Sequence, residues 1–233
     1  MKKILIALLF VLSVGPVTVA RGHGFLVSTN NGKLTLISED SNAGGLPLYT
    51  VQSMLGPANF KSADHPGYDV QGGITAGASI SFDVLGPLWY STGGAPVPSP
   101  VDMSIVPQDI LVPGSVTVTG SSGFQTGFLI GEYDGANLGA FEHQLNYSIA
   151  VPGSVPIGAY AVALQLTGMD SGGSPYTPSD PFVAVFNNGL SVGSLPAVSA
   201  QLYGVAVVPE PSSIVLAVVA GMALLFARRR SKQ

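Results

Sequence analysis

Cysteine is absent from this chain of 233 residues. Its absence excludes disulfide bonds, thiolate nucleophiles and metal sites built from cysteine. Charged residues are also scarce, at 9% of the chain, whereas 30 glycines and 18 prolines supply frequent turns. Short apolar runs separated by turn-forming residues favour a β-rich domain over a helical bundle.

Basic residues are nearly missing from the middle of the chain. Between residues 22 and 208 only Lys33 and Lys61 are basic, against twelve acidic residues, which leaves this body with a net charge of −10. Such a surface repels a phosphate backbone, so we exclude nucleic acid as a partner. We also find no Gly-x-Ser-x-Gly nucleophile elbow, no phosphate-binding loop and no carboxylate pair with supporting context, and we expect no enzymatic activity.

The N-terminus has the three parts of a secretory signal. Lys2 and Lys3 precede an apolar run from Ile4 to Val14, and a small-residue stretch then ends at Ala20. This order predicts a signal peptide over residues 1–20 that signal peptidase removes.

The C-terminus combines a short motif, an apolar segment and a basic cluster. The motif is Pro209-Glu210-Pro211, the residues from Ile214 to Ala227 carry no charge, and Arg228-Arg229-Arg230 follow. The apolar segment predicts a transmembrane helix over about residues 212–228, which is short for a membrane span. The arginines are expected to stay in the cytoplasm, which puts the body on the other side of the membrane.

This tail, residues 208–233, resembles the PEP-CTERM sorting signal of exported bacterial proteins. The resemblance implies recognition by an exosortase, a membrane transpeptidase, with cleavage near Pro209, Glu210 and Pro211 and transfer of the body to a surface or matrix component. It covers the tail and says nothing about the body over residues 21–207.

The body alternates between apolar and polar residues in the manner of half-buried strands. The clearest strands are 141–151 and 159–167, which we expect to be antiparallel neighbours joined by residues 152–158. In the second, Tyr160, Val162, Leu164 and Leu166 share the face that should meet the core. Further strands are expected at residues 25–28, 33–38, 79–85, 102–106, 115–119, 127–130, 182–186 and 201–207.

These strands predict an all-β fold, a single antiparallel β-sandwich of the Ig-like or jelly-roll-like kind. Asn30-Asn31-Gly32 indicates a tight hairpin between the first two strands. The stretch 86–114 contains six prolines and is expected to be largely an irregular surface excursion. No helix is expected between the two terminal segments.

Several residues could bind metal ions. Imidazoles of His23, His65 and His143 could form a zinc or copper site if the fold brought them together, although their spacing matches no compact motif. A cluster of oxygen ligands for calcium could form from Glu132, Asp134, Asn137 and Glu142, without the spacing of a known calcium loop.

The sequence therefore favours an exported, non-catalytic protein with a structural or adhesive role, located at the cell surface or in an extracellular matrix. The first alternative is a metal-binding surface protein that uses the three histidines. The second is a carbohydrate-binding or carbohydrate-active module that contacts extracellular polysaccharide, for which Trp89 and Tyr90 are the aromatic candidates. A core position for Trp89 is the competing interpretation.

Overall fold

The structure, a computed structural model, describes residues 25–38, 49–63, 67–70, 73–107, 114–133, 135 and 143–207. The expected signal peptide, the PEP motif, the segment 212–228 and the arginine cluster lie outside these residues. Among the described residues, no helix has the length and apolar character needed to cross a membrane.

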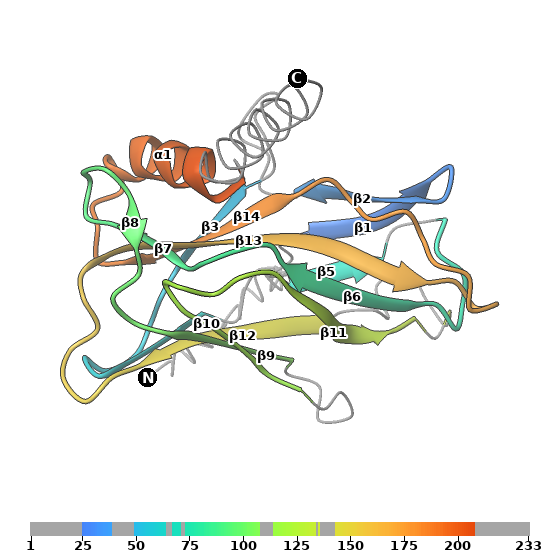
Figure 1. The fold of residues 1–233 in the computed structure, drawn as a ribbon, viewed down its shortest axis with the longest axis horizontal. Coiled ribbons are helices and arrows are strands. Elements are labelled where there is room, and N and C mark those ends of the chain that lie inside the picture. Colours follow the sequence, from blue (N-terminus) through green and yellow to red (C-terminus); the bar gives the residue numbers. More distant parts are fainter. Residues whose placement is uncertain are drawn as a thin grey trace, which may run out of the picture.

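Two sheets make up most of the described structure (Figure 1). The first sheet has the strand order β10-β9-β12-β5-β1-β2, and β4 also pairs with β12. Its strands are β1 (Phe25–Asn30), β2 (Lys33–Ser38), β4 (Phe60–Ala63), β5 (Gly67–Val70), β9 (Met103–Pro107), β10 (Val116–Val118) and β12 (His143–Ala150).

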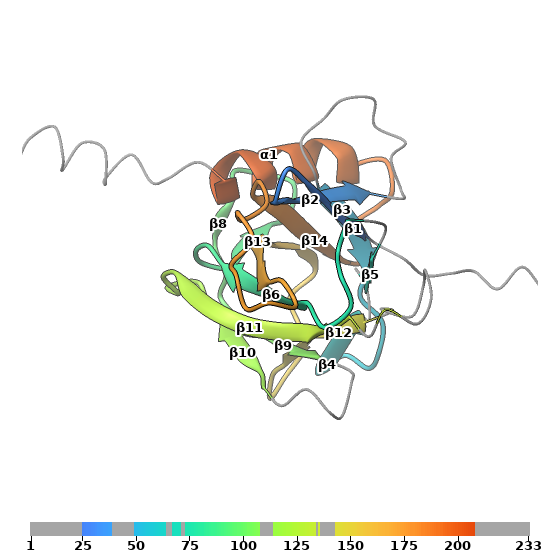
Figure 2. The ribbon, with the colours of Figure 1, turned by 90° about the vertical axis from the view of Figure 1, so that its right-hand side faces the viewer.

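The second sheet has the order β11-β6-β13-β14-β3, extended by β7 on β13 and β8 on β7. Its strands are β3 (Tyr49–Ser53), β6 (Ser79–Val84), β7 (Trp89–Ser91), β8 (Val97–Pro98), β11 (Gln125–Glu132), β13 (Gly158–Met169) and β14 (Phe182–Asn188). Helix α1 (Leu195–Val207) covers the outer face of this sheet. In Figure 2 the first sheet curves from β10 and β9 at the bottom towards β1 and β2, with α1 on top. The expected all-β, sandwich-like fold is confirmed.

Aromatic side chains fill the space between the two sheets. The ring centroid of Tyr147 lies 4.5 Å from that of Phe186, and the centroid of Tyr68 lies 6.4 Å from that of Phe182. Each pair joins one strand of the first sheet to β14. The hydroxyls of Tyr68 and Tyr147 are 3.4 Å apart in this interior. Burial is the main reason that the pKa of both tyrosines is raised.

Strand β13 is buried on both faces. Its expected core residues Tyr160, Val162, Leu164 and Leu166 point between the sheets and are fully buried, so this prediction is confirmed. The alternate residues Ala159, Ala161 and Ala163 face outward and pack under α1. Because alanine is small, the helix can lie close to the sheet.

The expected pairing of strands 141–151 and 159–167 is wrong. β12 pairs with β4, β5 and β9, whereas β13 pairs with β6, β7 and β14 of the other sheet. Alternation predicts which face of a strand is buried. It does not distinguish two strands that are neighbours in one sheet from two strands that face each other from two packed sheets. Residues 151–157, with two prolines, carry the chain from one sheet to the other.

The strand expected at residues 201–207 is also wrong, because these residues form the second half of α1. The β-branched residues there favour a strand locally. In the structure, Val198 and Leu202 lie one turn apart and pack onto the alanine face of β13. Tertiary packing thus overrides local propensity, and the expectation of no helix between the terminal segments is wrong.

The stretch 86–114 is more regular than expected. Besides the expected strand at β9, it contains β7 and the two-residue strand β8. Pro98 is tolerated in β8 because that strand lies at a sheet edge.

The sandwich is not purely antiparallel, since β1 pairs with β5 and β3 with β14 in parallel. The hairpin at Asn31 and Gly32 is confirmed, with φ values of 51° and 77°.

We predict that Leu202→Ala destabilises the protein by about 2–5 kcal/mol, because it leaves a cavity between α1 and the second sheet. Gln201→Ala is the matched control, since Gln201 is the neighbouring residue on the exposed side of the helix. Denaturant unfolding of both variants measures the difference. Equal stabilities would mean that α1 contributes little to the core.

We predict that stability decreases above about pH 10. Unfolded tyrosines ionise near that pH, whereas burial keeps Tyr68 and Tyr147 protonated in the folded state. The unfolded state then binds fewer protons, so the stabilising contribution, complete below pH 10, is lost as the pH rises towards the folded pKa values. Denaturant midpoints measured across this range test the trend, and Tyr147→Phe should weaken the pH dependence.

Candidate functional site

Four loops gather at one end of the sandwich, the left end in Figure 1. They are residues 54–59 between β3 and β4, 92–96 after β7, 151–157 between β12 and β13, and 189–194 between β14 and α1. We call these loops together the tip. The pairing register places them together, because Ala150 lies opposite Phe60, Gly158 opposite Asn188, and Ala159 opposite Ser91.

Hydrogen bonds hold loop 151–157 of the tip to its neighbours. The backbone amide of Val155 donates to the carbonyl of Ala58 at 2.8 Å. The side-chain amide of Asn188 donates to the carbonyls of Val155 and Pro156 at 3.2 and 2.9 Å. The hydroxyl of Tyr90 donates to the carbonyl of Ile157 at 2.7 Å. These bonds make the tip a preorganised surface.

Gly158 allows the close packing at the base of the tip. A Cβ atom at this position would collide with the ring of Tyr90 and would lie 2.9 Å from the carbonyl oxygen of Ser91. The ring of Tyr90 also packs on Tyr160, with centroids 5.0 Å apart. A side chain at position 158 would therefore push β7 away from β13.

The tip exposes aliphatic side chains and contains no charge. None of its four loops contains Asp, Glu, Lys, Arg or His. Val192, Leu55 and Ile157 are 82%, 72% and 65% exposed, and Phe60 at the start of β4 is 40% exposed. Grouped exposed hydrophobics rimmed by polar residues are typical of contact surfaces.

Two charged side chains of opposite sign belong to the rim of the tip. Lys61 in β4 donates from Nζ to the carbonyl of Gly56 at 2.6 Å. Asp102 directly precedes β9 and is exposed. β4 and β9 lie on opposite sides of β12, so the two charges flank the tip.

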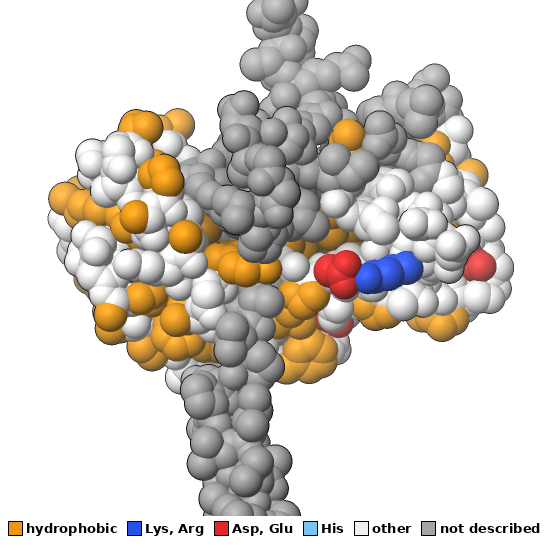
Figure 3. All heavy atoms as spheres, turned by 90° about the horizontal axis from the view of Figure 1, so that it is seen from above, with side chains coloured by type: hydrophobic (Ala, Val, Ile, Leu, Met, Phe, Trp, Pro, Cys, Tyr) orange, Lys and Arg blue, Asp and Glu red, His pale blue; other side chains and the backbone are white. Residues whose placement is uncertain are grey.

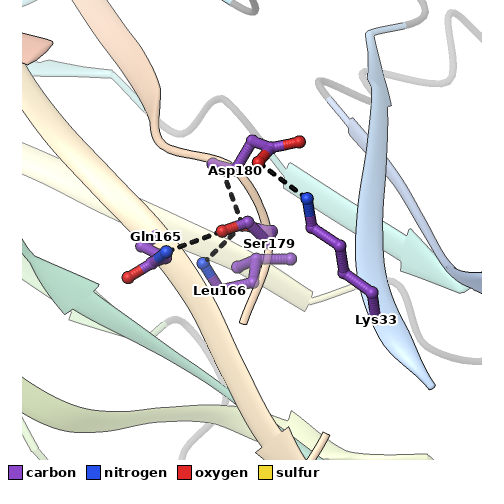
Figure 4. Close-up of polar contacts among 5 residues, drawn as sticks. All are labelled: Lys33, Gln165, Leu166, Ser179 and Asp180. Atoms are coloured by element: carbon purple, nitrogen blue, oxygen red, sulfur yellow. Dashed lines mark hydrogen bonds and ion pairs between the residues drawn. The ribbon is translucent and has the colours of Figure 1, made fainter. Parts of the chain in front are cut away.

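The opposite end of the sandwich has a different character. Lys33 forms a 2.7 Å ion pair with Asp180 (Figure 4), and Asp170 and Glu132 also lie at this end. On the face shown in Figure 3, the charged side chains that are visible lie only in the half away from the tip. The described charges are thus unevenly distributed along the long axis.

The polar contacts around Asp180 are structural. The buried Ser179 hydroxyl accepts a hydrogen bond from the Leu166 amide at 3.0 Å and donates to the Asp180 carbonyl, while Gln165 donates to the Ser179 carbonyl (Figure 4). These bonds fasten the β13–β14 loop to the sheet. The ion pair is exposed and contributes at most about 1 kcal/mol.

A small apolar pocket opens between the edge strands β10 and β11. Its volume is about 110 Å³, and Phe82, Ile105, Val116, Phe128 and Leu129 form its apolar walls. Pockets for small-molecule ligands usually measure roughly 300–1,000 Å³. We therefore interpret it as a gap between two sheet edges.

The histidine site stays a prediction. His143 is the first residue of β12, and its backbone pairs with Tyr68. His23 and His65 lie outside the described residues, as do Asp134, Asn137 and Glu142 of the calcium cluster. Glu132 ends β11 and is exposed. Within the described part of the chain, no three His, Cys, Asp or Glu residues form a group that could hold a metal ion.

Trp89 and Tyr90, the aromatic candidates for sugar binding, make contacts inside the molecule. Trp89 is partly buried and packs against the apolar cluster under α1. Tyr90 is occupied by its ring contact with Tyr160 and its hydrogen bond to Ile157. The core interpretation of Trp89 fits these contacts better than an exposed stacking platform.

The tip also contains a Gly-x-Ser-x-Gly pattern at residues 189–193, between a strand and a helix. In a hydrolase, this pattern forms a sharp, strained turn that presents the serine beside a histidine base. Here the backbone of Ser191 does not have a positive φ, and its hydroxyl lies 3.2 Å from that of Ser194. The hydroxyl of Ser194 also donates to the carbonyl of Ser191 at 2.8 Å, so the contacts of this pattern are those of a local turn before α1.

Taken together, the described residues define an all-β fold of two packed sheets with one covering helix and a tip whose loops contain no charged residue. No protein-family model, no curated protein and no solved structure matches this chain.

The tip was not predicted from the sequence. The sequence shows that each loop lacks charged residues and that Leu55, Ile157 and Val192 occur in them, but it does not show that the loops meet. Their loops are up to about 140 positions apart along the chain, and only the strand pairing brings them together.

We predict that Asn188→Ala loosens the tip. The substitution leaves the carbonyl of Val155 without this donor, at a cost of about 1–3 kcal/mol. The carbonyl of Pro156 keeps its hydrogen bond from the hydroxyl of Tyr160 at 2.7 Å. Amide hydrogen exchange should become faster in residues 151–157, with a smaller change in the middle of β13. Ser154→Ala, at an exposed position in the same loop, is the control. Unchanged exchange in the Asn188 variant would show that this side chain does not organise the loop.

Proposed function

We propose that this chain is an exported bacterial protein of the cell surface or extracellular matrix. Residues 1–20 act as a signal peptide, and an exosortase recognises Pro209, Glu210 and Pro211. The helix over about residues 212–228 anchors the protein, transiently or permanently, with Arg228, Arg229 and Arg230 in the cytoplasm. The support for this topology is the distribution of charged and apolar residues at the two ends.

The body has a structural or adhesive role and is not an enzyme. The observation that carries this proposal is the tip, whose hydrogen-bonded loops expose Leu55, Ile157 and Val192 without a charge. A rigid apolar surface loses little conformational entropy when it makes a contact. An Ig-like or jelly-roll-like relationship of the sandwich remains part of this proposal.

The position of α1 agrees with a tip that is free to make contacts. The helix begins next to the tip and runs back over the second sheet for thirteen residues, about 20 Å. The tail continues from the far end of this helix. Anchoring through the tail would therefore hold the body at a point remote from the tip.

The two alternative functions receive less support. Trp89 and Tyr90 make internal contacts, so they do not favour binding of extracellular polysaccharide. The zinc or copper site at His23, His65 and His143 remains an alternative that metal titration of the purified protein can test.

We predict that replacing Pro209, Glu210 and Pro211 together by alanine blocks processing of the tail. The chain should still be exported but should stay in the membrane fraction with its tail attached. Mass spectrometry of the fractionated protein, made in a bacterium with an exosortase, measures both ends. Replacement of Ser231 by alanine is the control. Unprocessed full-length wild-type chain in the cytosol would contradict the proposed export.

A further inference from the structure

We propose that the tip binds the tip of a second copy of this chain, so that two bodies associate end to end about a two-fold axis. This inference rests on the proposed role of the tip as a contact surface, and it adds the identity of the partner. In a two-fold arrangement the same patch serves both copies. A patch that is to meet itself must be apolar or carry balanced charges.

The charge distribution favours this arrangement over other contacts between copies. With a net charge of −10, two bodies repel each other when their acidic surfaces meet. The loops of the tip carry no charge, and the two rim residues, Lys61 and Asp102, cancel. Acidic residues such as Asp170, Asp180 and Glu132 lie near the opposite end.

The length of the body keeps these acids apart in the dimer. β13 spans the sandwich from Gly158 at the tip to Met169 at the other end, about 36 Å for a strand of this length. In a tip-to-tip dimer, the far ends are then separated by roughly twice this distance. That is several times the screening length of about 8 Å at physiological ionic strength.

The chemistry of the tip also argues against other partners. Leu55, Ile157 and Val192 are aliphatic, whereas sugar recognition relies on aromatic faces. Anionic lipid headgroups would find no basic residue in the loops and would repel the acidic body. The other exposed large hydrophobics, Val97, Val106, Phe124 and Met169, are single residues outside the loops of the tip. A second uncharged tip fits this surface best.

The absence of cysteine permits a direct test, because one introduced thiol is the only thiol in the chain. Val192→Cys places it on the tip, and Ser174→Cys places it on an exposed loop at the opposite end. Both full-length variants are produced in an exporting bacterium. Intact cells and medium are treated with a short membrane-impermeant bis-maleimide. We expect a cross-linked homodimer with Val192→Cys and only background with Ser174→Cys.

A second substitution tests the contact itself. Leu55→Lys in the Val192→Cys chain should abolish the cross-linked dimer, because it brings like charges together across the two-fold axis. Met169→Lys, at an exposed hydrophobic residue at the opposite end of the sandwich, should leave the dimer unchanged. Thermal unfolding of both variants checks that each remains folded.

The outcomes separate the two proposals. If an impermeant monofunctional maleimide labels neither thiol on cells or in medium, the proposed export and display fail. If both thiols are labelled but Val192→Cys forms no homodimer, or cross-links only to a different protein, the tip-to-tip contact is overturned while display stands. Equal dimer formation by Val192→Cys and Ser174→Cys would also overturn it.

Discussion

The burial of both faces of the central strand pair β13–β14 is the constraint on which the rest of the structure depends. Its inner face places Phe182 and Phe186 against Tyr68 and Tyr147 of the first sheet. Its outer face, made of alanine and valine, has to be covered by something else, and α1 covers it through Val198 and Leu202. A domain without disulfides thus obtains three packed layers. Residues 201–207 have a local preference for a strand, but they are helical because the helix buries the apolar outer face of this sheet.

The same strand pair determines where the functional surface lies. The connection between the sheets enters β13 at Gly158, and the turn into α1 leaves β14 at Asn188, directly opposite in the register. The two loops are therefore neighbours, and Asn188 joins them by hydrogen bonds. Lys33 and Asp180 lie at the other end, where they support the β13–β14 loop. Among the described residues, the asymmetry between the uncharged loops of the tip and the charged opposite end follows from the order of the strands, not from any single motif.

Sequence patterns predicted the parts of this fold that depend on neighbouring residues. Alternation identified the face of β13 that meets the core, and Asn31 with Gly32 identified a hairpin through the backbone conformations these residues favour. Patterns failed where a choice depended on distant residues. The partner of β12, the helical state of residues 201–207 and the two strands within the proline-rich stretch were each decided by what they pack against. The tip was missed for the same reason, since no local pattern links Leu55 to Ile157 or Val192.

By itself, the sequence determined the exclusion of cysteine chemistry, the acidic character of the body, and the expectation of export drawn from Lys2, Lys3 and the Pro209-Glu210-Pro211 tail. These properties depend on composition and on residues close together in the chain, so they need no fold to be recognised. Only the tertiary structure decided the three-layer arrangement, the contacts of Trp89 and Tyr90 inside the molecule, and the assembly of four uncharged loops into one surface. Each of these depends on contacts between residues far apart in the chain, and burial of apolar surface selects among such contacts only when the whole domain packs.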